Sequence, residues 1–525
     1  MTLLLRKISQ KNYFQSLIIL LFTLLLFLRS VQIPFLNDEI SFIKRNHASN
    51  LLDYLKLFEK KSYDGFYYRP LANFVSGITT FFFSYDVIYY RLFNLLLHAV
   101  SGILLYSFLL NLLKDNRRKK LISLFSALFF IAFPLNDYVV FWQTDLFDRL
   151  MLIFYLLGLI AFVKNNFKAG ILSMLFFLLS MLSKEMAFSF PLIIALITFY
   201  FAKEGKHFRA IISASLPYII LMFAFLLFRI IFLSNNVFTA KDAHSNGTLF
   251  IVIKNYFLFS GLLTFPFFIR EVQNIFLSHK IFFLATALIL FIPVLYYLYK
   301  KIKIESILLF FILFTIITIA PASRLFMRWY LYLPETGFAA FASYFLFSAG
   351  FKKMTTPFII ALSMLIIYSG AFLHKEADWI KTSDEAVDNL KEFISNNKIE
   401  IANSGEINFL TVPAKVNDIP IFNLGFEDLF NFYGKFSKPI TVNLYSKSYL
   451  NNFDDPIQIV RTSKSLILNQ TDDNYFILFN NGKSINFESN NFELETRKNL
   501  SINSMELKDK ILYTFSNGKF LKLEE

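Results

Sequence analysis

Long apolar runs are the feature of this chain that most constrains its fold. They recur from residue 13 to residue 373, and several approach the roughly 20 residues that a helix needs to cross a bilayer. The chain has 525 residues, is 56% hydrophobic and 19% aromatic, and has a mean hydropathy of +0.51. Soluble domains rarely carry so much apolar side chain. The sequence therefore predicts a polytopic membrane protein built as an all-α bundle.

Eleven of the apolar runs are candidate spans. Three of them are short, which predicts tilted or broken helices at those places. The segment 249–269 is also apolar, but a crossing there would put the basic residues that follow it on the wrong side, so we expect it to be re-entrant or interfacial. The eleven expected spans lie near residues 13–35, 88–112, 121–135, 150–163, 170–183, 187–202, 210–233, 281–299, 305–320, 331–350 and 355–373.

The distribution of positive charge predicts the orientation of these spans. Lys and Arg number 52 against 38 Asp and Glu, a formal net charge of +14. With the N-terminus in the cytoplasm, 18 of the basic residues fall in short cytoplasmic segments, as the positive-inside rule requires. Membrane topology then explains the excess of positive charge, and we expect no nucleic-acid partner. These segments are 6–11, 114–120, 164–168, 203–209, 300–303 and 351–353.

The composition changes after residue 373, where mixed polar sequence replaces the apolar runs. Because the number of spans is odd, we expect residues 374–525 to form a soluble α+β domain outside the cytoplasm. Residues 1–373 then form the membrane domain, with a first outer loop at about 36–87. The elements expected in the soluble domain are an amphipathic helix at 384–394, strands in 439–446 and 475–479, and turns at Asn481-Gly482 and Asn517-Gly518.

Carboxylates and cations gather on the predicted outer face. An ionisable group at membrane depth costs roughly 2.5–3.5 kcal/mol, so such groups usually line a wet cavity. A cavity lined by both positive and negative charges suits a reaction in which an anionic group leaves and a proton is removed. Each residue also has a simpler interpretation, because acidic residues can merely end a span and aromatic residues can form an interfacial belt. The chain has no cysteine, which excludes thiolate catalysis and disulfides.

Five motifs, in order along residues 35–345, give the chain a family resemblance. They are "NDE" at 37–39; "YYRPLANF" with "RLFNLLLHAV"; "PLNDYVVFW" followed by Asp148; "LSKEMAFSFP"; and "YLYLPETGFA". In this order they resemble the GT-C superfamily of polytopic glycosyltransferases, and within it the protein O-mannosyltransferases, including bacterial relatives and the transmembrane and tetratricopeptide-repeat enzymes.

The chain departs from that family pattern at three positions. Phe133 stands where the family has His before "PLN", and Tyr138 stands where it has Glu, with Asp137 one place early. Trp329 stands where the family has Arg before "YLYLP", with Arg328 one place early. The tail shows no 34-residue helical repeat of the tetratricopeptide kind. The resemblance therefore indicates the reaction class better than it indicates the acceptor.

The resemblance implies transfer of a sugar from a polyprenyl phosphate to an acceptor hydroxyl on the outer face, with inversion; protein O-mannosylation is one form of this reaction. A carboxylate would remove the hydroxyl proton; we assign this to Asp38, with Glu39 as the alternative or an orienting partner. Cations would hold the leaving phosphate. The candidates are Arg69, Arg91, Lys184, Arg324 and Arg328 for the phosphate, and Tyr68, Asp137, Trp142, Asp148 and Glu185 for the sugar or acceptor.

Several alternatives stay open at this point. A divalent cation could assist through Asp38, Asp137 or Asp148, although no ligand spacing demands one. The acceptor could be a protein, a lipid or a glycan, so a lipid- or glycan-modifying transferase fits the same residues. A transporter or flippase is a different class, which often shows inverted repeats. In every case we expect a multi-pass protein of the bacterial inner membrane.

Overall fold

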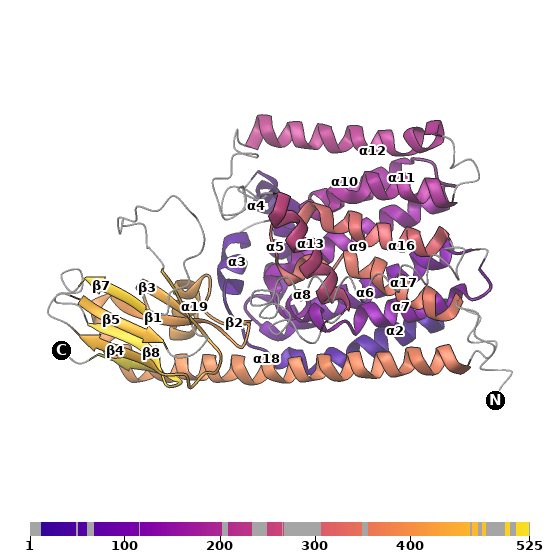
Figure 1. Ribbon diagram of the computed structural model, residues 1–525. Helices are drawn as coiled ribbons and strands as arrows, with labels where there is room; N and C mark the ends of the chain where they lie inside the picture. Colours follow the sequence, from indigo (N-terminus) through magenta and orange to yellow (C-terminus); the bar gives the residue numbers. More distant parts are fainter. Residues whose placement is uncertain are drawn as a thin grey trace. The chain divides into compact units, whose positions relative to one another are not determined.

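The structure is a computed structural model, and contacts divide its chain into two units that are described separately (Figure 1). The helical unit comprises Met1–Arg29, Ala48–Ile78 and Tyr89–Lys375; the C-terminal unit comprises Ser30–His47, Thr79–Ile88 and Glu376–Glu525. The structure describes residues 12–523 except 49–50, 60–67, 115, 202–207, 234–248, 265, 267–305, 349–354, 462–464, 471–474, 479–498 and 504–510.

Apolar helices make up the helical unit. Short 3-10 turns, η5 (Glu185–Ser189) and η8 (Arg328–Leu331), follow two of the breaks between them. The helices are α2 (Asn12–Phe27), α4 (Leu51–Leu55), α5 (Pro70–Phe83), α6 (Val87–Leu112), α7 (Lys119–Ile131), α8 (Asp137–Phe141), α9 (Leu146–Lys164), α10 (Ile171–Met181), α11 (Phe190–Phe201), α12 (Phe208–Phe228), α13 (Leu249–Thr264), α16 (Ser306–Ile319), α17 (Pro334–Ser348) and α18 (Thr355–Ser404).

Five helices in the described part of the chain are long and apolar enough to cross a membrane. A sixth is reached if α7 and α8 count as one span, bent by 45° where Pro134 interrupts it. These helices indicate a membrane protein, as predicted, but they do not confirm eleven spans. The five are Tyr13–Gln32, Val87–Leu112, Gln143–Lys164, Phe208–Ile231 and the apolar part of Thr355–Ser404.

The remaining expected spans have different outcomes. Those at 170–183, 187–202 and 305–320 correspond to apolar helices of 10–17 residues, which are short for a crossing. The span expected at 331–350 corresponds to α17, which has 15 residues. The span expected at 281–299 lies outside the described residues. The ambiguous segment 249–269 contains α13, whose 16 residues leave open whether it crosses.

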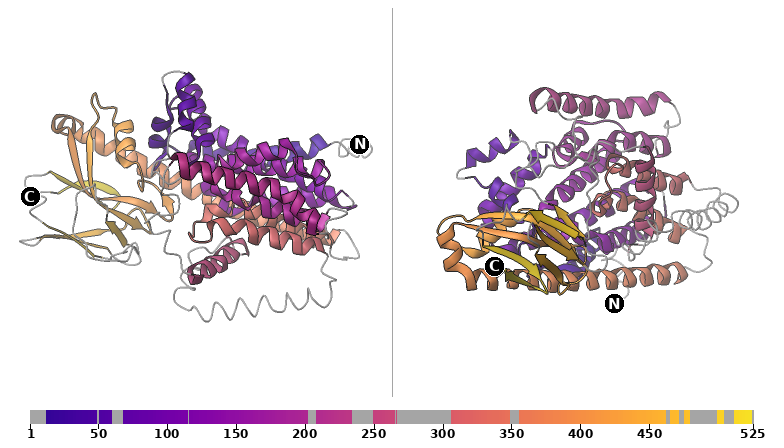
Figure 2. Two further views of the ribbon diagram at one scale, coloured as in Figure 1. Left: turned by 90° about the horizontal axis from the view of Figure 1, so that it is seen from above. Right: turned by 60° about the vertical axis from the view of Figure 1, so that its left-hand side comes forward.

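Helix α9 forms the centre of the helical unit. In its apolar stretch 83% of the residues are buried inside the structure, against 22% in that of α12. Helix α10 packs directly on α9, within the group of purple and magenta helices that run side by side in Figure 2. Side-chain hydrogen bonds join the two helices. The hydroxyl of Ser173 donates to the carbonyl of Gly158 at 2.7 Å, and that of Ser180 donates to Met151 at 3.0 Å. Small polar residues of this kind allow close helix approach in lipid.

The described residues of the expected outer loop, 36–87, include several helices. Among them are α3 (Glu39–Asn46), α4 and the apolar helix α5. Helix α5 has only 14 residues, so a search for runs of about 20 apolar residues passes over it. The boundary expected at residue 373 falls inside α18, a single helix of 50 residues. Its backbone hydrogen bonds do not depend on the change from apolar to polar side chains.

Two β-sheets and one short helix follow α18 in the C-terminal unit. The first sheet has the order β6-β3-β1-β8-β9, with β2 paired to β1; β1 is parallel to β3 and to β8, and the other pairs are antiparallel. The second sheet is antiparallel, β4-β5-β7. The elements are β1 (Glu406–Val416), β2 (Ile419–Pro420), α19 (Phe426–Gly434), β3 (Thr441–Leu450), β4 (Ile457–Arg461), β5 (Ser465–Gln470), β6 (Tyr475–Leu478), β7 (Asn499–Asn503), β8 (Leu512–Ser516) and β9 (Lys519–Lys522).

Aromatic side chains form the core under the first sheet. The ring of Phe393, on α18, lies 5.7 Å from that of Phe409 and 5.0 Å from that of Tyr513. The predicted strand at 439–446 is confirmed from residue 441 onward as part of β3, and the one at 475–479 is confirmed over 475–478 as β6; residue 479 lies outside the described residues. Asn517 and Gly518 join β8 to β9 with φ of 50° and 74°, which confirms that turn. The turn expected at Asn481-Gly482 lies outside the described residues.

Candidate functional site

A buried ion pair between Lys184 and Asp148 is the first element of the site in the helical unit. Asp148 lies in the first turn of α9, and Lys184 immediately precedes η5. The Lys184 ammonium donates to Asp148 Oδ2, and the two side chains are 3% and 1% exposed. The ammonium also lies 4.6 Å from the centre of the Tyr330 ring. Because removing two charges from water is costly, this pair depends on both partners.

Arg69 and Glu185 form the second pair. Arg69 precedes Pro70, the first residue of α5, and Glu185 opens η5 beside Lys184. The guanidinium donates to Glu185 Oε2 from Nε at 3.2 Å and from Nη2 at 2.8 Å. It also lies 4.7 Å from the centre of the Phe147 ring. The adjacent residues 184 and 185 therefore belong to two neighbouring ion pairs, in which residue 184 supplies the cation of one and residue 185 the carboxylate of the other.

Arg328 and Asp137 form the third pair, within a group of aromatic rings. Arg328 Nη2 lies 3.1 Å from Asp137 Oδ2, and its guanidinium carbon lies 3.9 Å from the centre of the Tyr138 ring. Tyr138 stacks on Trp329 with centroids 5.4 Å apart, and Trp142 meets Trp329 edge-on at 6.0 Å. Tyr138 is buried, whereas Trp142 and Trp329 are partly exposed, so the two indole rings are the accessible members of this group.

The structure thus brings six predicted residues together as three ion pairs, and Trp142 lies in the aromatic group beside the third. Arg91 is fully buried on α6, where it donates to the carbonyl of Phe141. Tyr68 is buried, and its hydroxyl donates to the carbonyl of Phe58 at 2.7 Å. Arg324 is exposed and lies outside the three pairs.

Two further arginines belong to this region and were not predicted. Arg149, next to Asp148, is fully buried and donates to the carbonyls of Trp142 and Gln143, both at 3.3 Å. Arg229 is buried in the π-turn that ends α12, within electrostatic range of Glu185. A charge inside an apolar run is itself a signal of function, and applying that test to every run would have found both.

The acidic pair of the "NDE" motif belongs by its contacts to the C-terminal unit. Glu39 is 1% exposed, and its Oε2 accepts a hydrogen bond from the Leu36 backbone at 2.9 Å. Asp38 is partly exposed. The two carboxylates therefore differ: Glu39 stabilises the local turn, and Asp38 is the more accessible to a substrate.

Residues 421–425, called the docking loop, contact this motif within the C-terminal unit. The Asn37 backbone N–H donates to the Ile421 carbonyl at 2.7 Å, and the Asn37 side chain accepts from the Leu424 N–H at 2.5 Å. Gly425, with φ of 64°, lies so close that a Cβ there would sit 2.4 Å from Ser41 Oγ. This close approach explains why glycine is required at that position.

Helix α19 and strand β3 support the same contact. Asp428, on α19, accepts from Ser41 Oγ at 2.6 Å and pairs with Lys44 at 2.9 Å. Lys447, on β3, donates to the carbonyl of Asn423 in the docking loop. Burial lowers the pKa of Lys447 to about 8, because the charged form loses its hydration. The turn that carries Asp38 is thus fixed by residues almost 400 positions away in the sequence.

No group of three or more His, Asp or Glu residues that could hold a metal ion occurs in the described ranges. Asp137 and Asp148, two of the three carboxylates considered for a cation, are occupied by Arg328 and Lys184. No protein-family model matches the chain, and no curated protein matches it.

Proposed function

We propose that the chain is a membrane glycosyltransferase that moves a sugar from a polyprenyl phosphate to an acceptor hydroxyl on the outer face. The observation that carries the proposal is the convergence of three cations, three carboxylates and stacked aromatic rings at one end of the helical unit. A sugar phosphate needs these groups: cations for the phosphate and aromatic faces for the ring. Their order along the chain is also the order of the motifs that resemble the GT-C enzymes.

The leaving phosphate would be held by Arg69, Lys184 and Arg328. Each of these cations is paired with a carboxylate, which keeps it oriented before the donor binds. A phosphate carries more charge than a carboxylate and accepts several hydrogen bonds, so it can share a guanidinium or ammonium with the resident partner. Developing negative charge on the phosphate is then stabilised by groups already in position.

Asp38 would act as the base that accepts the proton of the acceptor hydroxyl. It is the more accessible member of the acidic pair, whereas Glu39 accepts a hydrogen bond from the Leu36 backbone. The proton moves to the Asp38 carboxylate as the hydroxyl oxygen bonds to the anomeric carbon and the bond to the phosphate oxygen breaks. Sugar contacts fall to Trp142 and its neighbours, and the acceptor remains a protein, lipid or glycan.

The proposed topology has eleven spans, the N-terminus in the cytoplasm and residues after about 374 outside. Its support is the concentration of basic residues in the six segments that would face the cytoplasm. A reporter that is active only outside the cytoplasm, fused after Glu525, should be active. An inactive reporter, with a cytoplasmic reporter active at the same place, contradicts the orientation.

Direct transfer tests the function. The purified full-length protein in lipid nanodiscs is incubated with radiolabelled polyprenyl-phosphate sugars and with peptide, lipid and glycan acceptors. We expect one donor and acceptor pair to give labelled product together with free polyprenyl phosphate. Arg69→Gln should reduce transfer strongly, whereas Lys56→Gln, which removes an exposed surface pair with Asp53, should leave it unchanged. Movement of intact lipid-linked sugar across the bilayer without bond cleavage would favour a flippase instead.

A further inference from the structure

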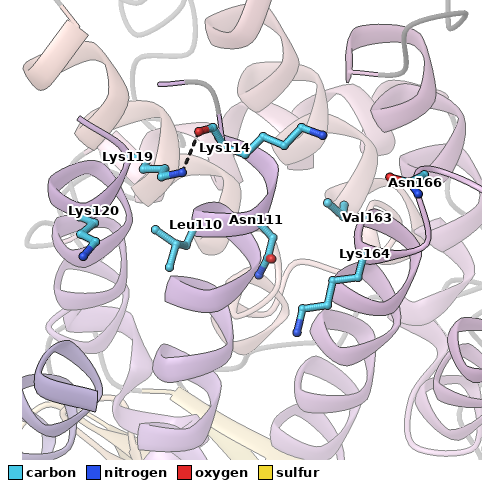
Figure 3. Close-up of a pocket in the computed structure, with 8 residues that line it drawn as sticks. All are labelled: Leu110, Asn111, Lys114, Lys119, Lys120, Val163, Lys164 and Asn166. Carbon is cyan, nitrogen blue, oxygen red and sulfur yellow. Dashed lines mark hydrogen bonds between the residues drawn. The ribbon is translucent and has the colours of Figure 1, made fainter. Parts of the chain in front are cut away.

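A second concave site lies in the helical unit, apart from the ion pairs. It is a hollow of about 470 Å³ between the end of α6, the start of α7 and the end of α9 (Figure 3). Its polar lining consists of Lys114, Lys119, Lys120, Lys164, Asn111 and Asn166. The aliphatic side chains of Leu110 and Val163 complete the lining.

The hollow lies at the opposite end of the helices from the proposed transfer site. Asp148 is in the first turn of α9, and Lys164 is the last residue of that helix. Sixteen residues of α-helix separate them by about 24 Å along the axis. This distance is comparable to the hydrocarbon thickness of a bilayer, about 30 Å. The two sites therefore belong to opposite interfaces of the proposed membrane span.

The charge of the hollow favours an anion. Four lysines from three segments line it, and none of the described residues that line it is acidic. Lys119 is held in place, because its ammonium donates to the carbonyl of Lys114 at 2.7 Å. Like charges gathered around one space repel one another, and a bound anion relieves that repulsion. Cationic pockets between membrane helices are known to receive lipid head groups.

Membrane topology alone accounts for basic residues at this end of the helices but not for which of them line the hollow. Arg117 and Lys168 come from the same two connecting segments and are exposed, yet neither lines the hollow. The positive-inside rule concerns the number of charges near a span and is indifferent to their direction. Arg117 and Lys168 therefore provide matched controls: they carry the same charge at the same end of the helices but do not line the hollow.

We propose that this hollow binds the phosphate head group of an anionic membrane phospholipid. Phosphate is the shared chemistry of a lipid and of the free ion, and the surroundings favour the lipid. Ile171 and Leu172 begin α10 just after the loop that follows α9, and they are 89% and 57% exposed. Acyl chains would cover such side chains while the head group meets the lysines. The proposal does not depend on the transfer reaction.

Lipid titration followed by native mass spectrometry of the full-length protein tests the proposal. The ligands are phosphatidylglycerol, phosphatidylcholine and inorganic phosphate, each added to detergent-purified protein. We expect phosphatidylglycerol to bind more tightly than phosphatidylcholine, and inorganic phosphate not to displace it at equal concentration. A cation near an anionic lipid surface changes binding by roughly fivefold. The double variant Lys119→Gln, Lys164→Gln should therefore weaken phosphatidylglycerol binding by about 10- to 30-fold.

The control is the double variant Arg117→Gln, Lys168→Gln, which removes the same charge from the same end and should leave binding within about twofold. Equal weakening in both double variants would show diffuse attraction and overturn the proposal. Displacement of the lipid by inorganic phosphate would overturn the lipid assignment. If the lysine double variant does not fold, Lys164→Gln against Lys168→Gln makes the same comparison, since both side chains are exposed.

Discussion

Replacing Gly425 by alanine tests whether the docking loop fixes the acidic turn. Gly425 has φ of 64°, and an added Cβ would lie 2.4 Å from Ser41 Oγ and 3.0 Å from Asp38 Cα. Two costs follow from this geometry. A left-handed backbone costs an alanine about 1–2 kcal/mol, and forcing extra atoms into a packed contact costs about 1–3 kcal/mol. Gly425→Ala should therefore destabilise the C-terminal unit by about 2–5 kcal/mol.

Gly405→Ala is the matched control for the backbone cost. Gly405 has φ of 70°, and an added Cβ would meet nothing within 4 Å. This variant should pay only the cost of the left-handed conformation, about 1–2 kcal/mol. The difference between the two alanine variants isolates the clash with the turn that carries Asp38.

Hydrogen exchange of the amides in residues 36–46, measured by mass spectrometry on the full-length protein, provides a readout independent of activity. We expect faster exchange there in Gly425→Ala and wild-type exchange in Gly405→Ala, because only the first variant displaces the turn. If the proposed function holds, turnover should fall in Gly425→Ala with little change in donor KM, since the variant displaces the proposed base Asp38 and leaves the proposed phosphate ligands in place. Equal exchange in both variants would refute the reasoning about the docking loop.

Three further predictions concern single side chains. Asp38→Asn should reduce turnover by about 10² or more with donor binding retained, and Glu39→Gln should reduce it less; full activity of both variants would remove the acidic pair from the mechanism. Lys184→Met leaves Asp148 buried without its cation and should lower stability by about 3–5 kcal/mol; adding Asp148→Leu should restore the melting temperature but not transfer, and failure to restore it contradicts a simple pair. The folded pKa of Lys447, about 8, lies below its unfolded value of about 10.4, so burying the charged lysine costs the full penalty below pH 8, and the penalty disappears as pH rises towards 10. Lys447→Met should therefore raise the melting temperature relative to wild type more at pH 7 than at pH 10. A difference that does not change with pH would count against the assignment.

The sequence by itself determined the features that depend on neighbouring residues. An uninterrupted run of about 20 apolar side chains favours a helix long enough to cross a bilayer, so Val87–Leu112 and Phe208–Ile231 could be predicted from the sequence. The turn at Asn517-Gly518 was also predictable from neighbouring residues, because Asn and Gly tolerate the positive φ that such a turn requires. Helix α5 was missed because its 14 residues are too few for the span criterion.

The tertiary structure alone decided which charges meet. Arg69 pairs with Glu185 across 116 positions, and no local pattern states that partnership. The separation of the acidic pair into a buried Glu39 and a more accessible Asp38 depends on how one short turn folds back on itself. The attachment of that turn to the docking loop joins residues 37 and 424, which are 387 positions apart. Such contacts are set by chain topology and by the packing of whole units, which a pattern of adjacent residues does not contain.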